Sequence, residues 1–187
     1  MVNQKEKVRE LIIEIALPEG ISAELDNGML SLRGPKGDVK RKFLDKNIII
    51  QCKDKVLSLK ASRFNKANKK LIKSYVAHIK GMIRGVSDGY RYTLKICSGH
   101  FPMNVSVSNN KLIVKNFLGE KSPRILELKP GADVKVEGDH VVVESKNKEI
   151  AGQVSSDIEQ LTRRTRYDMR IFQDGIWIVS KDRKETK

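Results

Sequence analysis

Histidines and cysteines are the residues of this sequence best able to carry chemistry, and there are only three His and two Cys among 187 residues. His78 falls near the border between the apolar and basic faces of a predicted helix, and His140 falls at a turn between strands. Neither has a Ser, Cys or carboxylate at a catalytic spacing, so both are expected to be partly exposed structural residues. His100 lies between Ser98-Gly99 and Phe101-Pro102. That setting is consistent with a plain loop residue or with one placed against a phosphate or base.

Metal-binding and catalytic patterns are missing from the sequence. Cys52 and Cys97 have no CxxC spacing and no histidine at ligand spacing, so they are expected to be small, reduced, buried residues. An enzyme acting on nucleic acid would need paired carboxylates or a metal cluster. Acids such as Asp45, Asp54 and Asp139 instead fall at turns, where aspartate serves the backbone. We therefore expect no catalytic residue, no metal and no cofactor, and the protein is predicted not to be an enzyme.

Glycine-rich phosphate loops are also missing, because neither GxGxxG nor GxxxxGK[ST] occurs. Gly34-Pro35-Lys36-Gly37 fits the GxxG pattern with which KH domains clamp an RNA backbone. That KH loop joins two helices, whereas the flanks here read as strands, so a tight hairpin turn is the favoured interpretation. Aromatic residues make up 5% of the chain, so stacking on bases is not expected to be the main mode of binding.

The net charge of +14 is the strongest indication of a partner. Such an excess repels itself within one compact chain, and nucleic acid or an anionic membrane is the usual reason for it. No apolar run approaches the roughly 18 residues of a membrane span. Glu14 interrupts the apolar stretch that a signal peptide would need. A cytosolic, RNA-binding protein is therefore predicted, with the arginines from Arg163 to Arg170 as the sharper candidates because guanidinium forks match phosphate.

Hydrophobic periodicity predicts the elements that position these residues. Asn27-Gly28 and Asn109-Asn110 are each flanked by short apolar or alternating runs, which predicts a hairpin with a tight turn in each half. An apolar stripe at helical spacing follows in each half. Asn65 is expected to cap the first helix and Gly85 to end it. The predicted helices cover 65–85 and 150–161, and further short strands are predicted at 39–44, 47–52, 56–59, 124–128, 133–136 and 139–144.

The two halves repeat one order of strands, a helix, and an Asp-Gly pair that leads into a strand. The pairs are Asp88-Gly89 and Asp174-Gly175. We interpret this as an α+β fold of two tandem similar domains, each mainly antiparallel sheet with one packed helix, in which the phrase recurs because the domain recurs. The predicted boundaries are 1–86, 87–181 and, for a short basic tail, 182–187. The first helix carries lysines on its outer face, but the second half collects its cations after its helix, which predicts different tasks for the two copies.

Five phrases give the sequence a family resemblance over nearly its whole length. They are SLRGPKGDV at 31–39, GVSDGYRYTL at 85–94 with HFPMNV at 100–105, NFLGEK at 116–121, AGQVSSDIEQ at 151–160 and DMRIFQDGIWIVSK at 168–181. In this order and with this repeat, the chain is similar to the universal large-subunit ribosomal protein six family, in its archaeal and eukaryotic form. It departs from bacterial members, whose C-terminal stretch is rich in Pro, Tyr, Lys and Gly, so contacts of that stretch cannot be transferred.

The resemblance implies a structural ribosomal protein of two similar domains. It implies binding to 23S-type rRNA near the sarcin–ricin loop and the base of the factor-binding stalk, beside neighbouring large-subunit proteins. The second domain is expected to make most of the rRNA contact. The implied location is the cytoplasmic large ribosomal subunit, with no membrane, no small-molecule substrate and no homo-oligomer. An RNA-binding adaptor outside the ribosome, built from the same duplicated domain, is the alternative that cellular location would separate.

The resemblance also implies which residues bind rRNA. Gly152 and Gln153 are expected to open a helix whose free N–H groups meet phosphate. The arginines and Lys181 are expected to hold the RNA backbone near the C-terminus. The full implied set is Gly99, His100, Lys115, Asn116, Lys121, Gly152, Gln153, Arg163, Arg164, Arg166, Arg170 and Lys181.

Overall fold

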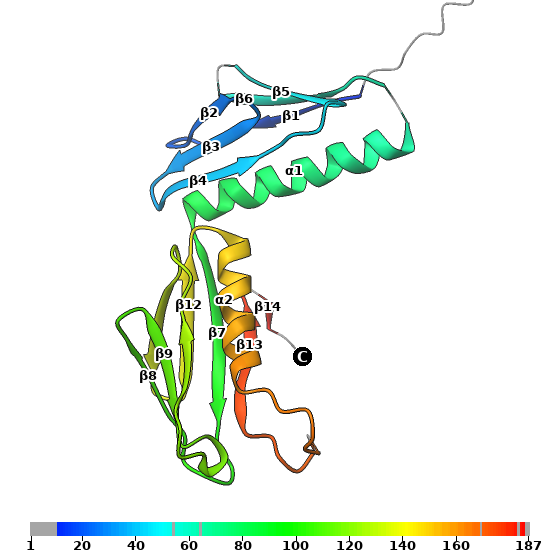
Figure 1. Cartoon of the computed structure of the whole chain (residues 1–187). Helices are drawn as coiled ribbons and strands as arrows, with labels where there is room; N and C mark the ends of the chain where they lie inside the picture. The colour runs from blue at the N-terminus through cyan, green and yellow to red at the C-terminus, as the bar shows by residue number, and fades with distance from the viewer. Residues whose placement is uncertain (1–10, 54, 64, 169, 183, 186–187) are drawn as a thin grey trace, which may run out of the picture. The chain divides into compact units, whose positions relative to one another are not determined.

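The computed structural model describes residues 11–53, 55–63, 65–168, 170–182 and 184–185. Contacts between residues divide the chain into two compact units, Met1–Asp88 and Gly89–Lys187. In the described residues, each unit contains two antiparallel sheets and one α-helix (Figure 1). Within the described residues, neither α-helix is both long enough and apolar enough to cross a membrane.

The first described element of the first unit is a strand that the sequence analysis did not predict, β1 (Leu11–Ala16). β1 pairs with β6 (Val56–Ala61), and β6 pairs on its other side with β5 (Ile48–Lys53). The other sheet consists of β2 (Ser22–Asp26), β3 (Met29–Gly34) and β4 (Gly37–Lys42) in chain order.

The two predicted turns of this sheet are confirmed. Asn27 and Gly28 join β2 to β3 with φ of 45° and 76°, the positive values that a tight type I′ turn needs. Gly34 and Gly37 are paired across the β3–β4 turn, so the GPKG phrase is a hairpin turn and not a KH loop.

α1 (Lys66–Ser87) packs its apolar face against the sheets of the first unit (Figure 1). Alternate residues of β3 and β6 face this helix, because side chains along a strand point to opposite sides of the sheet. Each completely buried leucine or isoleucine contributes roughly 2 kcal/mol of apolar burial. Among the described apolar residues of this unit, those with no exposed surface are Leu30, Leu32, Leu57, Leu59, Ala61, Ile72, Ile79 and Val86.

The start of α1 agrees with the sequence analysis and its end does not. The Asn65 side chain accepts the Asn68 N–H at 2.6 Å, as an N-cap should. Gly85 was expected to end the helix, but the helix continues to Ser87 and Gly85 is buried inside it. The reason is tertiary: the β3–β4 turn packs on the last turn, where Lys36 donates its N–H to the Val86 carbonyl at 2.9 Å.

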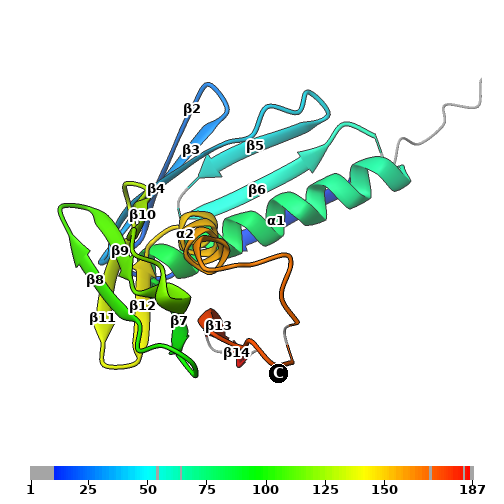
Figure 2. The same cartoon turned by 60° about the horizontal axis from the view of Figure 1, so that its bottom comes forward.

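The second unit repeats this arrangement with other residues (Figure 2). Its hairpin turn at Asn109-Asn110 again has positive φ at both positions, 49° and 59°. α2 (Lys148–Leu161) packs on the sheets of this unit, and a 3-10 turn, η1 (Phe117–Gly119), follows β9. The strands are β7 (Tyr90–Cys97), β8 (Asn104–Ser108), β9 (Lys111–Lys115), β10 (Arg124–Glu127), β11 (Asp133–Glu137), β12 (His140–Ser145), β13 (Gly175–Lys181) and β14 (Lys184–Glu185).

The sheet orders show the duplication. The first unit has β5-β6-β1 and β2-β3-β4, and the second has β11-β12-β7 and β8-β9-β10 in the same relation. The predicted α+β class, with antiparallel sheet and one helix in each copy, is confirmed. β13 and β14 extend the second unit beyond this common pattern, because they continue its larger sheet as β11-β12-β7-β13-β14.

The repeated Asp-Gly phrase requires a correction. Both pairs lead into a strand, as predicted, but the strands are β7 and β13, which pair with each other in one sheet of the second unit. The strand of the first unit that is equivalent to β7 is β1, which no Asp-Gly pair precedes in the predicted repeat. The two phrases therefore do not occupy equivalent positions of two repeats. The phrase recurs because two neighbouring strands begin in the same way, and not because the domain recurs. Of the expected basic tail, Lys184 and Glu185 form β14 and 183, 186 and 187 lie outside the described residues.

Candidate nucleic-acid interface

Asp174 ties two loops of the second unit together. Its Oδ1 accepts the backbone N–H of Gly99 at 2.7 Å and of His100 at 3.0 Å, and its Oδ2 lies 2.5 Å from His100 Nδ1. The His100 ring also stacks on Phe172, with ring centroids 4.8 Å apart. The β7–β8 loop (residues 98–103) is therefore fixed against the connection between α2 and β13. Gly99 and His100 are both exposed.

The Asp174 carboxylate is a buried charge with its own donors. Burial acts to raise the pKa of Asp174, but the hydrogen bonds from His100 and Gly99 outweigh burial and hold the pKa below its usual range. The carboxylate is therefore ionised at neutral pH. Lys95 and Cys97 of β7 line the same open pocket as His100 and Asp174.

A second loop of this unit presents Lys115 and Lys121. Asn116 takes a left-handed conformation with φ of 60°, and its Nδ2 donates to the Pro102 carbonyl at 2.9 Å. Phe117, 1% exposed, anchors the segment in the core of the unit. The two lysines on either side of this anchor are exposed, so the loop holds both cations toward solvent on a fixed backbone.

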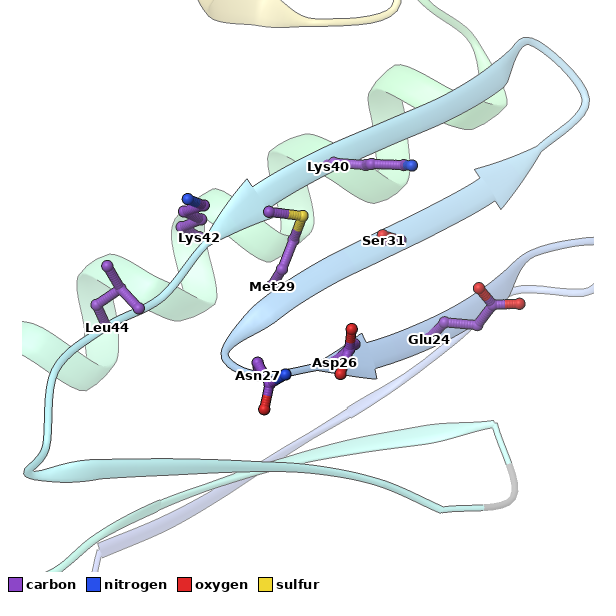
Figure 3. Close-up of a pocket in the computed structure, with 8 residues that line it drawn as sticks. All are labelled: Glu24, Asp26, Asn27, Met29, Ser31, Lys40, Lys42 and Leu44. Atoms are coloured by element: carbon purple, nitrogen blue, oxygen red, sulfur yellow. The ribbon is translucent and has the colours of Figure 1, made fainter.

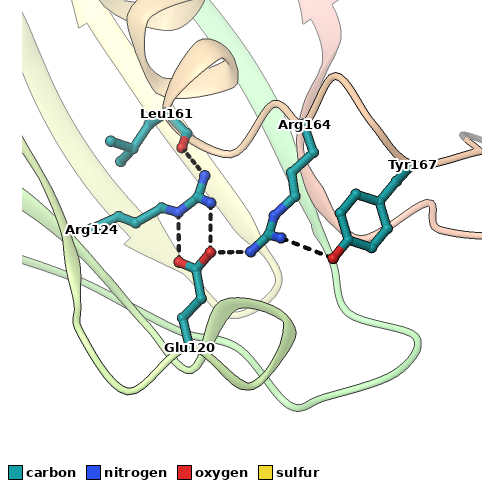
Figure 4. Close-up of polar contacts among 5 residues, drawn as sticks. All are labelled: Glu120, Arg124, Leu161, Arg164 and Tyr167. Atoms are coloured by element: carbon teal, nitrogen blue, oxygen red, sulfur yellow. Dashed lines mark hydrogen bonds and ion pairs between the residues drawn. The ribbon is translucent and has the colours of Figure 1, made fainter.

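Glu120 sits at the centre of a cluster that joins this loop to the end of α2 (Figure 4). It accepts Nε and Nη2 of Arg124, both at 2.8 Å, and it also pairs with Nη2 of Arg164. Arg124 donates Nη1 to the Leu161 carbonyl at 2.6 Å, which satisfies a free carbonyl at the helix C-terminus. Hydrogen bonds from Arg124 lower the pKa of Glu120; burial acts the other way, and the charges of both arginines add to the lowering. Residues 120, 124 and 164 are named the Glu120 cluster below.

The Glu120 cluster gives Arg164 a role that the sequence analysis did not foresee. Arg164 was expected to hold the RNA backbone, but its side chain is 24% exposed and pairs with Glu120 and with the Tyr167 hydroxyl at 3.2 Å. Its guanidinium also lies over the ring of Phe117, 5.5 Å from the centroid. Arg164 therefore orders the start of the α2–β13 connection.

The remaining predicted cations are exposed. Arg163 and Arg166 lie on the surface of the α2–β13 connection, and Lys181 lies at the end of β13. Arg170 pairs with Asp168 at 2.9 Å, and the pair lowers the pKa of Asp168 and raises the pKa of Arg170. A surface pair of this kind is weak, so Arg170 remains accessible to a second partner.

The expectation for Gly152 and Gln153 was wrong in its physical basis. α2 begins at Lys148, behind the cap residue Asn147, whose side chain accepts the Glu149 N–H at 2.9 Å. Gly152 and Gln153 therefore lie in the second turn, where N–H groups already bond the carbonyl four residues earlier. Their backbone N–H groups are not free to meet a phosphate.

The first unit has a pocket of a different character over the sheet β2-β3-β4 (Figure 3). Strand register places a carboxylate on β2 and a lysine on β4 in each of two neighbouring rows across this sheet. The opposite charges balance, so the pocket gives phosphate no net attraction. Its lining residues are Glu24, Asp26, Asn27, Met29, Ser31, Lys40, Lys42 and Leu44.

Sequence reasoning missed the residues that hold the interface together, namely Asp174, Glu120, Arg124 and Phe172. The sequence analysis gave Asp174 only the role of a turn residue before a strand. Its hydrogen-bond partner Gly99 is 75 positions away in the sequence. Glu120 does stand inside the NFLGEK phrase, which was the one available signal. In the described part of the chain, no group of His, Cys, Asp and Glu is arranged to hold a metal ion, and Cys52 and Cys97 are free thiols.

The two α+β units share one topology, and the loops of the second unit carry exposed cations. These features define a basic protein with a duplicated domain, suited to binding an anionic partner. Comparison with known proteins then gives the family. The model of ribosomal protein L6 matches residues 17–89 and 101–175, and the chain belongs to this family. As a member it is a structural ribosomal protein and not an enzyme, as predicted.

Three archaeal relatives, each called large ribosomal subunit protein uL6, agree with this assignment. The protein of Methanosarcina mazei is 41% identical over 174 residues, which cover 93% of this chain and 99% of the relative. That of Nanoarchaeum equitans is 45% identical over 177 residues, covering 90% and 92%. That of Methanobrevibacter smithii is 40% identical over 169 residues, covering 90% and 95%. The predicted family is confirmed.

Proposed function

We propose that this protein is a constituent of the large ribosomal subunit and binds 23S-type rRNA near the sarcin–ricin loop and the base of the factor-binding stalk. Neighbouring large-subunit proteins complete its surroundings there. The similarity to large-subunit proteins supports the general role, and the family resemblance of the loop phrases supports the location.

One observation carries the choice of the second unit as the RNA-binding unit. Its loops hold exposed cations on a backbone that the Glu120 cluster and Asp174 fix in place. A fixed set of cations recognises the shape of a folded RNA, because each charge meets a phosphate without first being ordered. The contact set that we propose is Gly99, His100, Lys115, Asn116, Lys121, Arg163, Arg166, Arg170 and Lys181.

Replacing Arg163 and Arg166 together by alanine should weaken binding to the sarcin–ricin region of large-subunit rRNA by about tenfold or more. It should also reduce the slope of log affinity against log salt by about two, because two phosphate contacts are lost. The measurement is a titration at several salt concentrations with excess tRNA as competitor. Arg164 is left in place because it is part of the Glu120 cluster.

The matched control removes two charges from the first unit, Lys73→Ala with Lys80→Ala, on the exposed face of α1. We expect this control to keep most of the affinity and the preference over tRNA. An equal loss in both double variants would mean that only the total charge matters, and the assignment to the second unit would be wrong. Sedimentation of the tagged chain with large ribosomal subunits tests the location and separates this proposal from an RNA-binding adaptor outside the ribosome.

A further inference from the structure

The His100 ring is held in one orientation by three kinds of contact. Its Nδ1 faces Asp174 Oδ2 at 2.5 Å, its own backbone N–H is bonded to Oδ1 of the same carboxylate, and its ring stacks on Phe172. The side chain of Asp174 is 4% exposed and that of His100 is 39% exposed. The imidazole therefore lies between the buried carboxylate and solvent.

An ionised carboxylate can only accept hydrogen bonds, so the nitrogen that faces Asp174 must carry a proton. When the ring is neutral, its one proton is then on Nδ1 and Nε2 presents a lone pair. When the ring is charged, Nε2 also carries a proton and can donate. The hydrogen bonds that lower the pKa of Asp174 keep it ionised at neutral pH, which makes this restriction permanent there.

The consequence for an anion is specific. A phosphate oxygen is an acceptor, so it is repelled by the lone pair of the neutral ring and bound by the N–H of the charged ring. Lys95 lines the same pocket and adds a second cation. We propose that His100 and Lys95 form a phosphate-binding site for the RNA backbone, and that Asp174 is the positioning residue that makes the site active only when His100 is protonated. This rests on the proposed binding of RNA by the second unit.

The charged and titratable groups around His100 come from β7 and from the connection between α2 and β13. From β7 come Lys95 and Cys97, and from the residue before β13 comes Asp174. Tyr167 contacts Phe172 edge-on at 5.1 Å and so lies behind the stacked ring. Histidine is the side chain whose charge ordinarily changes between about pH 5 and 8. The charged form of His100 is therefore expected to bind the RNA backbone more tightly than the neutral form.

Asp174→Asn is the decisive variant because it keeps the shape of the site. Both backbone N–H bonds go to Oδ1, which asparagine retains, whereas Oδ2 becomes an NH₂ that donates to His100 Nδ1. The ring proton then moves to Nε2, where even the neutral imidazole can donate to phosphate. The variant is expected to lose the pH dependence while the unit remains folded.

The experiment measures the affinity of the full chain for the sarcin–ricin rRNA fragment at several pH values from 6 to 8 and at constant ionic strength. We expect wild type to lose about tenfold in affinity across this range, and Asp174→Asn and His100→Gln to change less than about twofold. Asp139→Asn is the control at a similar pair, in which Asp139 lies 2.5 Å from His140 Nδ1. This variant should keep the wild-type change of RNA affinity with pH. Cys97→Ser should keep it as well. An Asp174→Asn variant with the wild-type slope overturns the proposal.

A second readout needs no RNA and so separates this proposal from the proposed function. ¹⁵N spectra of the free protein report which nitrogen of His100 carries the proton when the ring is neutral. We expect Nδ1 in the wild type and Nε2 in Asp174→Asn. Wild-type spectra with the proton on Nε2 overturn the role of Asp174. Failure to prefer the rRNA fragment over tRNA, with the expected spectra, overturns the RNA-binding function instead and leaves the control of the ring by Asp174 established.

Discussion

Valine in place of Gly175 should destabilise the second unit by about 3 kcal/mol, the range of a strained backbone combined with a steric clash. Gly175 has φ of 154°, within the positive region that side chains rarely adopt. An added Cβ would lie 3.3 Å from the Trp177 ring and 3.4 Å from Thr162 Oγ1. Thr162 Oγ1 also accepts the N–H of Ile176 at 2.9 Å, so the added side chain would lie beside a buried hydrogen bond at the start of β13.

Urea unfolding followed by tryptophan fluorescence is the appropriate measurement, because Trp177 is the single tryptophan of the chain and reports on the second unit alone. Gly99→Val is the matched control: nothing lies within 4 Å of its added Cβ. We expect this control to unfold at nearly the wild-type urea concentration. If Gly175→Val unfolds there too, and circular dichroism shows a native fold, the structural role of Gly175 is wrong.

The second large effect is expected from Glu120→Gln. The substitution leaves the half-buried guanidinium groups of Arg124 and Arg164 without a counter-charge, and their side chains are only 23% and 24% exposed. We expect a loss of about 2 kcal/mol in the free energy of unfolding, as for hydrogen bonds to charged groups that are shielded from water. Urea unfolding at neutral pH with the same fluorescence signal gives the value.

Glu127→Gln is its control, because Glu127 also pairs with a base, Lys111 at 3.0 Å, but has a side chain that is 78% exposed. A surface pair contributes about 0 to 1 kcal/mol, so little change is expected. Equal losses in the two variants would contradict a stabilising role for burial in the Glu120 cluster.

The same cluster predicts the direction of a pH effect. The pKa of Glu120 is lower in the folded chain than the usual glutamate value. The unfolded chain therefore binds the proton more readily, and the stabilisation is fully present above the usual pKa of glutamate and disappears as the pH falls through the lowered value. The difference in stability between wild type and Glu120→Gln should shrink over that acidic range. A constant difference down to the lowest pH measured would count against this assignment.

Local signals in the sequence predicted most of the fold. The Asn27-Gly28 and Asn109-Asn110 turns, the cap at Asn65 and the apolar stripes of both helices each depend on residues close together in the chain. The errors occurred where distant contacts decide. α1 passes through Gly85 because the β3–β4 turn packs on Val86, and β13 is placed by its pairing with β7.

The candidate site was predicted less well for the same reason. The exposed cations could be named from their types, because an arginine after a helix and a lysine in a loop are usually accessible. The contacts that hold these cations in place could not be predicted. Glu120 and Arg164 are 44 positions apart in the sequence, and Asp174 and His100 are 74 positions apart. The pairing of Arg164 with Glu120 could not be foreseen, because nothing in the segment around Arg164 shows the acid that it meets.

The pairing of β13 with β7 also has a consequence for biosynthesis. Gly175 pairs with Cys97, so the first and one of the last strands of the second unit are neighbours in its sheet. A chain emerging residue by residue can fold its N-terminal unit early, but one edge of β7 must wait for its partner β13, which is translated after α2. Asp174 is made at that same late moment. A nascent chain that stops before Asp174 therefore lacks both the β13 strand of this sheet and the group that orients His100, and only the product of late elongation can carry the complete site.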